Sequence, residues 1–401
     1  MTLSPDPLGV AANQADSNDP RVRLRDLASY FLRLGTTGFG GPIALVGYMQ
    51  KDLVEERRWY SQQDYLQGLA FSQLSPGPLA AQLAIYLGWL RAGPLGATLT
   101  GVAFIVPSFL MVIVLAVFYV QFGGLPWIHG MFYGIGAAVI AIIARSAVKL
   151  LRGTVGKDRL LWVIFLAMAI TTVWKQSEIV WLFLLCGLIT MLVKAPPSLT
   201  AHASLVVLPS ITAKLITGGT GVATLGTLVL LFLFFAKAGA FVFGSGLAIV
   251  PFLYGGVVGH YHWLTERQFV DAVAIAMITP GPIVITAAFI GYLVGGAVGA
   301  TLAASAVFAP PYFFVLLGAP YYRRFANNPQ VKAFVQGVTA AAVGAIAGAA
   351  YILARRSLTD VPTVLIAVIT FAILTATKKI PEPVLILVAG VIGMVLRGNL
   401  R

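Results

Sequence analysis

The chain is a succession of apolar segments, each close in length to a helix that crosses a lipid bilayer. Such a helix needs about 20 mostly apolar residues, and continuous apolar runs without apolar–polar alternation exclude a transmembrane β-barrel. The pattern therefore predicts an all-α, polytopic bundle of transmembrane helices. The expected segments lie at 24–48, 66–91, 95–121, 128–151, 160–174 and 178–194, and again at 228–258, 269–294, 297–320, 332–354, 361–377 and 383–397.

The second group of segments repeats the first. Matched residues lie 204 positions apart early in each half and 203 positions apart later, as after the loss of one residue. Chance similarity of composition would not keep this register over most of a half, so the chain consists of two homologous halves in tandem. The matches are Phe39 with Phe243, Trp59 with Trp263, Ser75 with Thr279, Gly96 with Gly299, Pro107 with Pro310, Gly134 with Gly337, and Gly187 with Gly390.

The repeat predicts four regions: a polar tail (1–23), a first half (24–194), a linker (195–227) and a second half (228–397). If the linker crosses the membrane once, the halves are inverted and the chain has about 13 spans; otherwise they are parallel and it has about 12. Basic residues collect on the cytoplasmic side of membrane proteins. Their distribution favours inverted repeats with a cytoplasmic N-terminus.

Composition narrows the class of protein. Hydrophobic residues make up 59% of the chain and charged residues 10%, whereas soluble domains carry about 25% charged residues. The net charge of +13 is that of basic membrane loops, and we expect no nucleic acid partner. A single cysteine excludes a disulfide framework, and we expect neither a metal nor a cofactor. The first 23 residues have no apolar core and do not resemble a cleaved signal peptide.

Gly and Pro motifs interrupt the first two apolar segments of each half. A single motif of this kind often only kinks a helix, but paired breaks in two repeats indicate the substrate site of a transporter. Broken helices expose N–H groups and a positive dipole end to an anion. We expect Ser75 and Thr279 to be N-caps, followed by Pro76 and Pro280 at the first helical positions. Gly77 and Gly281 would let a ligand approach the backbone.

One cation accompanies the first break in each half. Arg33 precedes Phe39 by six residues, and Lys237 precedes Phe243 by six. A charge at membrane depth costs about 2.5–3.5 kcal/mol on insertion scales, so it is either functional or reaches the interface. We expect a site for an oxyanion, formed by cations, hydroxyls and backbone donors. The expected substrate-binding residues are Arg33, Gly40, Gly41, Pro42, Ser75, Pro76 and Gly77, with Lys237, Gly244, Gly246, Thr279, Pro280 and Gly281.

Five other charged residues are candidates for coupling or gating. Asp271 opens the second broken segment of its half, although an interfacial position is the simpler expectation. Glu55 and Glu56 are expected in a solvated loop that could form a gate, and Arg91 is expected to snorkel from a segment end. Arg145 stands opposite Gly348 in the other half and so breaks the repeat.

The main alternative to a transporter is an integral-membrane enzyme acting on lipid phosphates. That chemistry needs acidic metal ligands or a nucleophile with its base, whereas the 14 acidic residues here are scattered. A channel is a third alternative, but two unequal halves with broken helices favour alternating access. The chain has no Walker motif, so ATP is not expected to be the direct energy source.

These motifs resemble the chromate ion transporter family in its long, two-domain bacterial form. The resemblance rests on Gly38-Phe39-Gly40-Gly41-Pro42, the Trp59 region, Ser75-Pro76-Gly77-Pro78 and the corresponding second-half motifs, and it extends from about residue 24 to 397. Many relatives have a His shortly after the first Gly-Gly-Pro, where this chain has Ala44 and Leu45, and the second half has Phe243-Gly244-Ser245-Gly246 instead of Phe-Gly-Gly-Pro.

The resemblance implies export of chromate across the bacterial inner membrane, driven by the membrane potential or a proton gradient, and hence chromate resistance. The alternative within this class is a permease for sulfate or a related oxyanion. The expected partners are chromate, sulfate as a competitor, the lipid bilayer, and a second copy of the chain in a homodimer.

Overall fold

The computed structural model describes residues 23–39, 41–122, 125–175, 180–196, 225–241, 246, 249–322, 328–377 and 380–398, and every regular element in them is helical. Gly40, Gly244 and most of the linker lie outside the described residues. The first half contains α1 (Leu24–Thr37), α2 (Gly41–Met49), the π-helical turn η1 (Gln50–Glu56), α3 (Gln62–Leu74), α4 (Leu79–Phe122), α5 (Pro126–Thr154), α6 (Arg159–Lys175) and α7 (Val180–Lys194).

The second half repeats this order of elements. It contains α8 (Leu225–Phe241), α9 (Ile249–Leu253), the π-helical turn η3 (Tyr254–His260), α10 (Glu266–Ile278), the 3-10 turn η4 (Ile283–Ile285), α11 (Thr286–Gly318), the 3-10 turn η5 (Ala319–Tyr321), α13 (Pro329–Ser357), α14 (Val361–Ala376) and α15 (Glu382–Gly398).

Unusual backbone conformations recur at the repeat offset. The π-helical turns η1 and η3 begin 204 residues apart. Arg58 and His262 follow them with φ of 54° and 51°, a conformation that residues other than glycine rarely adopt. Ser61 and Thr265 then cap α3 and α10 through their side chains. The duplication read from the sequence is thus confirmed in the backbone.

The predicted breaks are also present. The first segment of the first half is divided into α1 and α2, and the second into α3 and the first part of α4. At Ala92 and Gly93 the backbone of α4 leaves the helical conformation. The Thr100 hydroxyl then donates to the Ala84 carbonyl at 2.9 Å, although 16 residues of straight helix would span about 24 Å. α4 is therefore a tight hairpin followed by a long helix, and α11 bends in the same way at Gly295 and Gly296.

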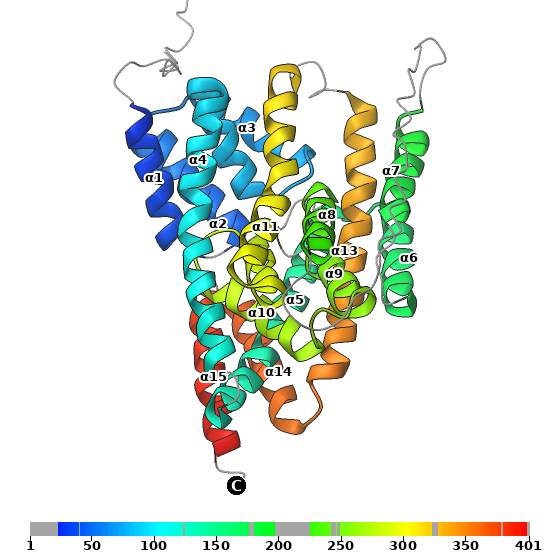
Figure 1. Ribbon diagram of the computed structural model, residues 1–401. Helices are drawn as coiled ribbons and strands as arrows, with labels where there is room; N and C mark the ends of the chain where they lie inside the picture. The colour runs from blue at the N-terminus through cyan, green and yellow to red at the C-terminus, as the bar shows by residue number, and fades with distance from the viewer. Residues whose placement is uncertain are drawn as a thin grey trace, which may run out of the picture.

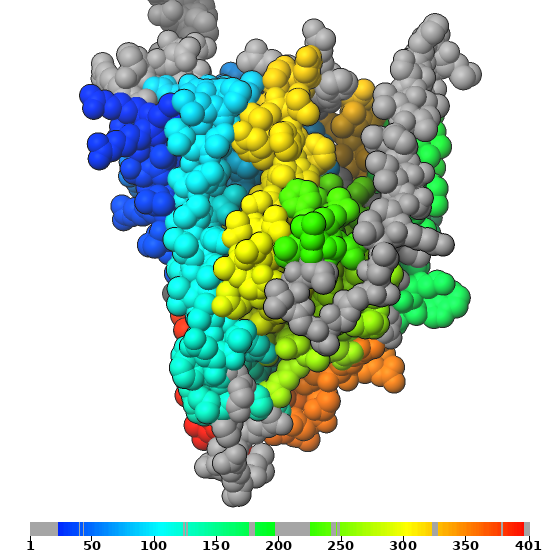
Figure 2. Space-filling model, viewed as in Figure 1, coloured from blue at the N-terminus to red at the C-terminus, as the bar shows by residue number. Residues whose placement is uncertain are grey.

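The two halves are inverted relative to each other. Following the colours in Figure 1, the long part of α4 runs in the opposite direction to that of α11, and α5 runs opposite to α13. The long parts of α4 and α11 lie side by side on one face of the molecule (Figure 2). This inversion agrees with the distribution of basic residues along the sequence, which also favours inverted repeats.

Each half is completed by the last two helices of the other half. α6 and α7 pack on α13, whereas α14 and α15 pack on α5. Glycines allow the closest approaches: a Cβ at Gly134 would overlap the Ala389 carbonyl, and one at Gly337 would lie 2.5 Å from the Cys186 carbonyl oxygen. Small residues at crossings of this kind are typical of membrane helices. The halves found in the sequence are consequently not separate units in space.

The outer surface of this bundle is apolar. Val114 on α4, Ile170 on α6, Val193 on α7 and Val368 on α14 are each more than half exposed, and soluble monomers rarely expose so much contiguous apolar surface. Within the described residues, four helices are long and apolar enough to cross a membrane, namely the long helices α4, α5, α11 with its flanking turns, and α13. The chain is a multi-pass membrane protein.

Candidate functional site

The two Pro-Gly-Pro loops lie after α3 and α10, where each helix ends. Ser75 and Thr279 are the C-caps of these helices, and each has an extended backbone. The prediction that they are N-caps of the following helices is wrong, because Gly77 and Gly281, directly after the prolines, have φ of +141° and +97° and so cannot continue a helix. The next helices begin only after the loops, at Leu79 in the first half and, after the 3-10 turn η4, at Thr286 in the second.

The second-half loop is fixed to the first half of the chain. The Gly281 amide donates to the Gly38 carbonyl, with the nitrogen and oxygen 3.0 Å apart, and the Ser108 hydroxyl donates to the Pro280 carbonyl at 2.7 Å. Gly281 has φ +97°, and a Cβ there would overlap the Ser108 hydroxyl. Only glycine satisfies both constraints. In this conformation the Gly281 amide binds protein and is not offered to a ligand.

The first-half loop meets the second half at the equivalent place. A Cβ at Gly77 would lie 2.8 Å from Pro311 Cβ, and Pro311 is the repeat counterpart of Ser108. The buried Gln82 amide supports this loop by donating to Ser75 Oγ at 3.1 Å and to the Pro76 carbonyl at 2.6 Å. Each Pro-Gly-Pro loop therefore contacts the opposite half of the chain. Sequence reasoning missed Gln82, although a glutamine in an apolar segment next to the motif was a usable signal.

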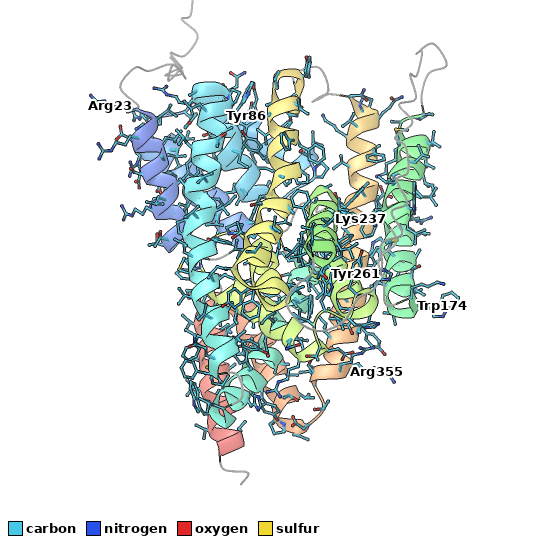
Figure 3. The ribbon with its side chains drawn as sticks, viewed as in Figure 1. Arg23, Tyr86, Trp174, Lys237, Tyr261 and Arg355 are labelled. Carbon is cyan, nitrogen blue, oxygen red and sulfur yellow. The ribbon has the colours of Figure 1, made fainter. Side chains whose placement is uncertain are left out.

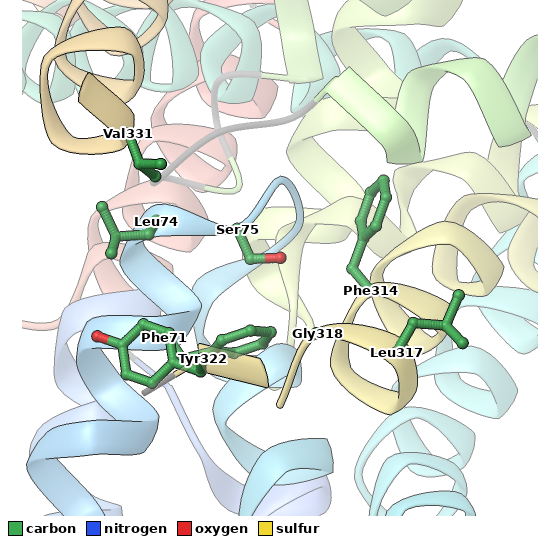
Figure 4. A pocket seen from close by; sticks show the side chains of 8 residues that line it. All are labelled: Phe71, Leu74, Ser75, Phe314, Leu317, Gly318, Tyr322 and Val331. Carbon is green, nitrogen blue, oxygen red and sulfur yellow. The ribbon is translucent and has the colours of Figure 1, made fainter. Parts of the chain in front are cut away.

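The two motif hydroxyls differ in what they face. Thr279 is 7% exposed and donates to the Ala276 carbonyl of its own helix at 3.1 Å. Ser75 is 9% exposed and lines a cavity of about 340 Å³ (Figure 4). An anion entering this cavity would meet the Ser75 hydroxyl. The other lining residues are mostly apolar: Phe71, Leu74, Phe314, Leu317, Gly318, Tyr322 and Val331.

The predicted cations lie on exposed faces of their helices. Arg33 is exposed on α1, and Lys237 is exposed on α8 (Figure 3). Within the described part of the chain, neither side chain forms an ion pair or a hydrogen bond. Their assignment as ligands of an oxyanion therefore stays a prediction.

The glycines and proline of the first break are placed as a broken helix requires. Gly41 has φ +74° and begins α2, with Pro42 in the first turn. In the second half, a Cβ at Gly246 would lie 3.5 Å from Ile283 Cβ. Because Ile283 directly follows the Thr-Pro-Gly-Pro loop, the two breaks of the second half lie close together.

Asp271 is buried within the bundle and is only 3% exposed. This burial arises because α10 packs between α5 and α11, and the expected interfacial position of Asp271 stays a prediction. The Tyr119 hydroxyl, from α4 of the other half, donates to Asp271 Oδ2 at 2.8 Å. Cavities of about 410 and 270 Å³ both reach Asp271 and Arg267. Tyr119 and Arg267 were missed because nothing local in the sequence shows which distant helices will pack together.

The remaining charged candidates lie at three separate places. Glu55 and Glu56 are exposed at the end of the turn η1, not in a loop, and Glu56 pairs with Lys51 at 3.5 Å. Arg91 is the last residue before the bend in α4. Arg145 on α5 pairs with Glu382 on α15 at 3.6 Å. This last pair joins the two halves.

The arrangement is suited to binding and moving a small solute. Two loops related by the repeat meet the opposite half at equivalent positions, and a cavity reaches one of them. Within the described residues, no group of three His, Cys, Asp or Glu side chains could hold a metal ion.

Comparison with known proteins identifies relatives over nearly the whole chain. The family model described as "Chromate transporter" matches residues 25–191 and 229–394. The chain is 54% identical over 392 residues to the chromate transport protein of Cupriavidus metallidurans, covering 98% of each chain. It is 52% identical over 386 residues to the probable chromate transport protein of Synechococcus elongatus, covering 94% of this chain and 96% of the relative.

A more distant relative spans the same length. The chromate transport protein of Pseudomonas aeruginosa is 32% identical over 398 residues, covering 95% of this chain and 94% of the relative. No solved structure matches the chain.

Proposed function

The chain belongs to the chromate transporter family, and from this premise we propose that it exports chromate across the bacterial inner membrane by alternating access and thereby confers chromate resistance. Chromate as the substrate is supported by the names of the two relatives that are more than half identical over nearly the full length. The fold supports a transporter, because many secondary transporters are built from inverted repeats with broken helices.

The observation that carries this proposal is the crossed packing of the two Pro-Gly-Pro loops. Gly281 lies against Ser108 of the first half, and Gly77 lies against Pro311 of the second. A shift of α4 and its loop relative to α11 and its loop would change both contacts together. In our proposal chromate binds between the loops, near Ser75 and the broken ends of α2 and α9, with Arg33 and Lys237 as candidate counter-charges.

The distribution of basic residues supports an N-terminus in the cytoplasm. Arg23 lies at one end of the molecule and Arg355 toward the other (Figure 3). At the end with Arg23, where α1 and α13 begin and α7 ends (Figure 1), Arg25, Lys332 and Lys194 lie in the terminal turns of these three helices. By the positive-inside rule we assign this end to the cytoplasm. The cavity that reaches Ser75 lies at the same end and would admit cytoplasmic chromate.

The membrane potential favours the outward direction. Moving one elementary charge through 100 mV changes the free energy by about 2.3 kcal/mol. For a chromate dianion leaving a cell that is negative inside, the gain is about twice that value, so export needs no ATP. Sulfate, which is also a tetrahedral dianion, is the expected competitor.

Radiolabelled chromate flux into everted membrane vesicles tests the proposal. With NADH as energy source, we expect uptake that an uncoupler abolishes and that sulfate inhibits. Sulfate movement without chromate flux would instead indicate a sulfate permease. Absence of flux for both anions, in protein that reaches the membrane, would refute transport of either.

Variants of the two cations test the counter-charge assignment separately. If Arg33 and Lys237 contact chromate, Arg33→Ala and Lys237→Ala should each raise the chromate concentration needed for half-maximal flux. Arg33→Lys would then separate bidentate recognition from simple charge. Unchanged affinity in both alanine variants would remove these residues from the site and leave the loops as the remaining candidates.

A further inference from the structure

Two tyrosines related by the repeat lie at opposite ends of the bundle and make different contacts. Tyr119, near the end of α4, donates its hydroxyl to Asp271 of α10 at 2.8 Å. Its counterpart Tyr322, after α11, packs its ring edge-on against Phe71 of α3, with the ring centres 5.3 Å apart. The repeat counterpart of Asp271 is Gln67. Only the first of these two contacts between halves contains an ionisable carboxyl group.

The two Pro-Gly-Pro loops also differ in how closely a cavity approaches them. At the Tyr322 end, a cavity reaches Ser75. At the Tyr119 end, the two cavities reach Asp271, and Asp271 lies two helical turns before Thr279 on α10. Along α4, Ala116 and Val112 are fully buried between Tyr119 and the loop contact at Ser108. The described structure is therefore open toward one loop and closed toward the other.

We propose that Asp271 and Tyr119 form a proton-binding latch, which holds the approach to the second Pro-Gly-Pro loop closed while Asp271 carries a proton and releases it when Asp271 loses that proton. This inference rests on the proposed function, because it describes how the transport site becomes accessible from the far side. On release, the O–H bond of the carboxyl group breaks and the proton passes to water in the adjoining cavity. The ligand is thus a proton, and it acts on the contact between the halves.

The latch depends on the charge of Asp271. Burial in the closed state disfavours the ionised carboxylate, and the single hydrogen bond from Tyr119 does not offset the desolvation of a charge that has no cation partner. Loss of the proton therefore favours a state in which the carboxylate reaches water and the contact between α4 and α10 opens. Phe289 and Phe132 pack edge-on against the Tyr119 ring and hold its hydroxyl toward the carboxylate.

Among the described residues, the Tyr119 hydroxyl is the direct polar partner of the Asp271 carboxyl group, and the charged side chains nearby bind other groups. Arg267, one turn earlier on α10, donates to the His129 carbonyl at 3.4 Å. Arg356 of α13 pairs with Glu266 and donates to the Tyr254 hydroxyl. Within the described residues, no cation lies at ion-pair distance from Asp271. The titratable groups that face this region are Glu266 and Arg267 of α10, Tyr119 of α4, His129 and Tyr133 of α5, Tyr254 of η3, Arg356 of α13, and Glu382 of α15, which pairs with Arg145.

A buried reporter cysteine can measure whether the latch opens. In the full-length chain with Cys186→Ser, the Ala116→Cys reporter lies one turn from Tyr119 at a position that is 0% exposed. We would label right-side-out and everted vesicles with a membrane-impermeant maleimide between pH 8 and pH 6. The exposed Val120→Cys, labelled at the same pH, corrects for the pH dependence of thiol reactivity.

We expect Asp271→Asn, which imitates the protonated carboxyl group, to decrease labelling of the reporter from one side at pH 8 by about tenfold, equivalent to about 1.4 kcal/mol. Tyr119→Phe should increase labelling, because it removes the hydrogen bond between α4 and α10. With Asp271 present, labelling should rise as the pH on that side rises, and with Asp271→Asn it should not depend on pH. The matched control Tyr322→Phe should change nothing, because Tyr322 packs on Phe71 through its ring.

Labelling that is unchanged by Asp271→Asn, by Tyr119→Phe and by pH would overturn the latch. A second reporter, Val112→Cys, which is equally buried, replaces Ala116→Cys if that variant does not reach the membrane. Because labelling requires no chromate, a pH-dependent reporter together with absent chromate flux would refute the proposed substrate and keep the latch. Normal flux with an unresponsive reporter would do the reverse.

Discussion

The two helix crossings that join the halves are built on equivalent glycines and are completed by different polar contacts. Where α5 crosses α15, Gly134 packs against the Ala389 carbonyl, and Arg145 pairs with Glu382. Where α13 crosses α7, Gly337 packs against Cys186 and Thr190. There the polar contact lies at the helix ends: Lys194 donates to Gln336 at 3.0 Å and pairs with Asp158.

This difference separates two kinds of requirement. The glycines recur in both halves because close helix packing has the same geometry in each. The polar contacts do not recur, so the two ends of an otherwise symmetrical bundle are held with unequal strength. In an inverted repeat, exchanging the conformations of the halves would give the state open to the other side. Unequal contacts therefore favour one of the two states over the other.

The largest effect is expected for Gly134→Val, which tests the close glycine packing that both crossings share. The added side chain must displace the α15 backbone, and overpacking of this kind costs about 3 kcal/mol or more. We expect a large loss of folded protein, measured by thermal unfolding in detergent and by abundance in the membrane. The control Gly153→Val, on the same helix, meets open space and should retain most of the stability. Equal losses for both variants would show that the crossing is not the sensitive element.

The sequence predicted the repeat but not the exchange of helices between the halves. Gly134 and Gly337 were recognisable as a matched pair, yet a single chain does not reveal that each would face the last helices of the other half. The broken segments were predicted correctly because Gly and Pro act locally on the backbone. The N-cap assignment of Ser75 failed because Gly77, with φ +141°, prevents a helix from starting at Pro76. The Tyr119–Asp271 contact joins residues 152 positions apart, and no local pattern identifies such a pair.

Arg145→Ala tests the polar contact at the first crossing. Removal of one partner of a buried ion pair costs about 3–5 kcal/mol. Because Arg145 and Glu382 remain about one quarter exposed, we expect a smaller loss of about 1–2 kcal/mol, after allowing for solvent screening. The double variant Arg145→Ala with Glu382→Gln should recover part of the stability in thermal unfolding. An additive double variant would mean that the two side chains do not interact.

A smaller effect is expected in the two Pro-Gly-Pro loops, where Ser75→Ala can be compared with Thr279→Ala. The Ser75 hydroxyl lines a cavity, whereas the Thr279 hydroxyl is bound within its own helix. A hydrogen bond contributes about 0.5–1.5 kcal/mol, so Ser75→Ala should raise the chromate concentration for half-maximal flux by up to about tenfold. Thr279→Ala should leave it nearly unchanged when measured from the cytoplasmic side. The opposite order would place the binding site at the second loop.

The smallest effect is expected where the start of α6 meets the end of α7 and Asp158 pairs with Lys194. The hydrogen bond from Lys194 lowers the pKa of Asp158, so this pair stabilises the folded protein above the unfolded pKa of about 4. The contribution is lost as the pH falls through the lower, folded-state pKa. For a partly exposed pair it amounts to about 0–1 kcal/mol. In the second half a carboxylate, Asp360, stands at the corresponding start of α14, where it caps the helix and accepts from the Tyr133 hydroxyl.

Thermal unfolding of Asp158→Asn across the pH range measures that contribution. The variant should unfold at a slightly lower temperature than the unmodified chain at pH 7, and the two curves should converge below about pH 4. High salt should reduce the difference at pH 7, because partly exposed charges are screened. Glu56→Gln, which removes the partner of Lys51 in a more exposed ion pair, is the matched control and should shift the curve less. A difference that persists in acid would mean that Asp158 acts through the cap of α6, where it accepts from the Leu160 amide, and not through its charge.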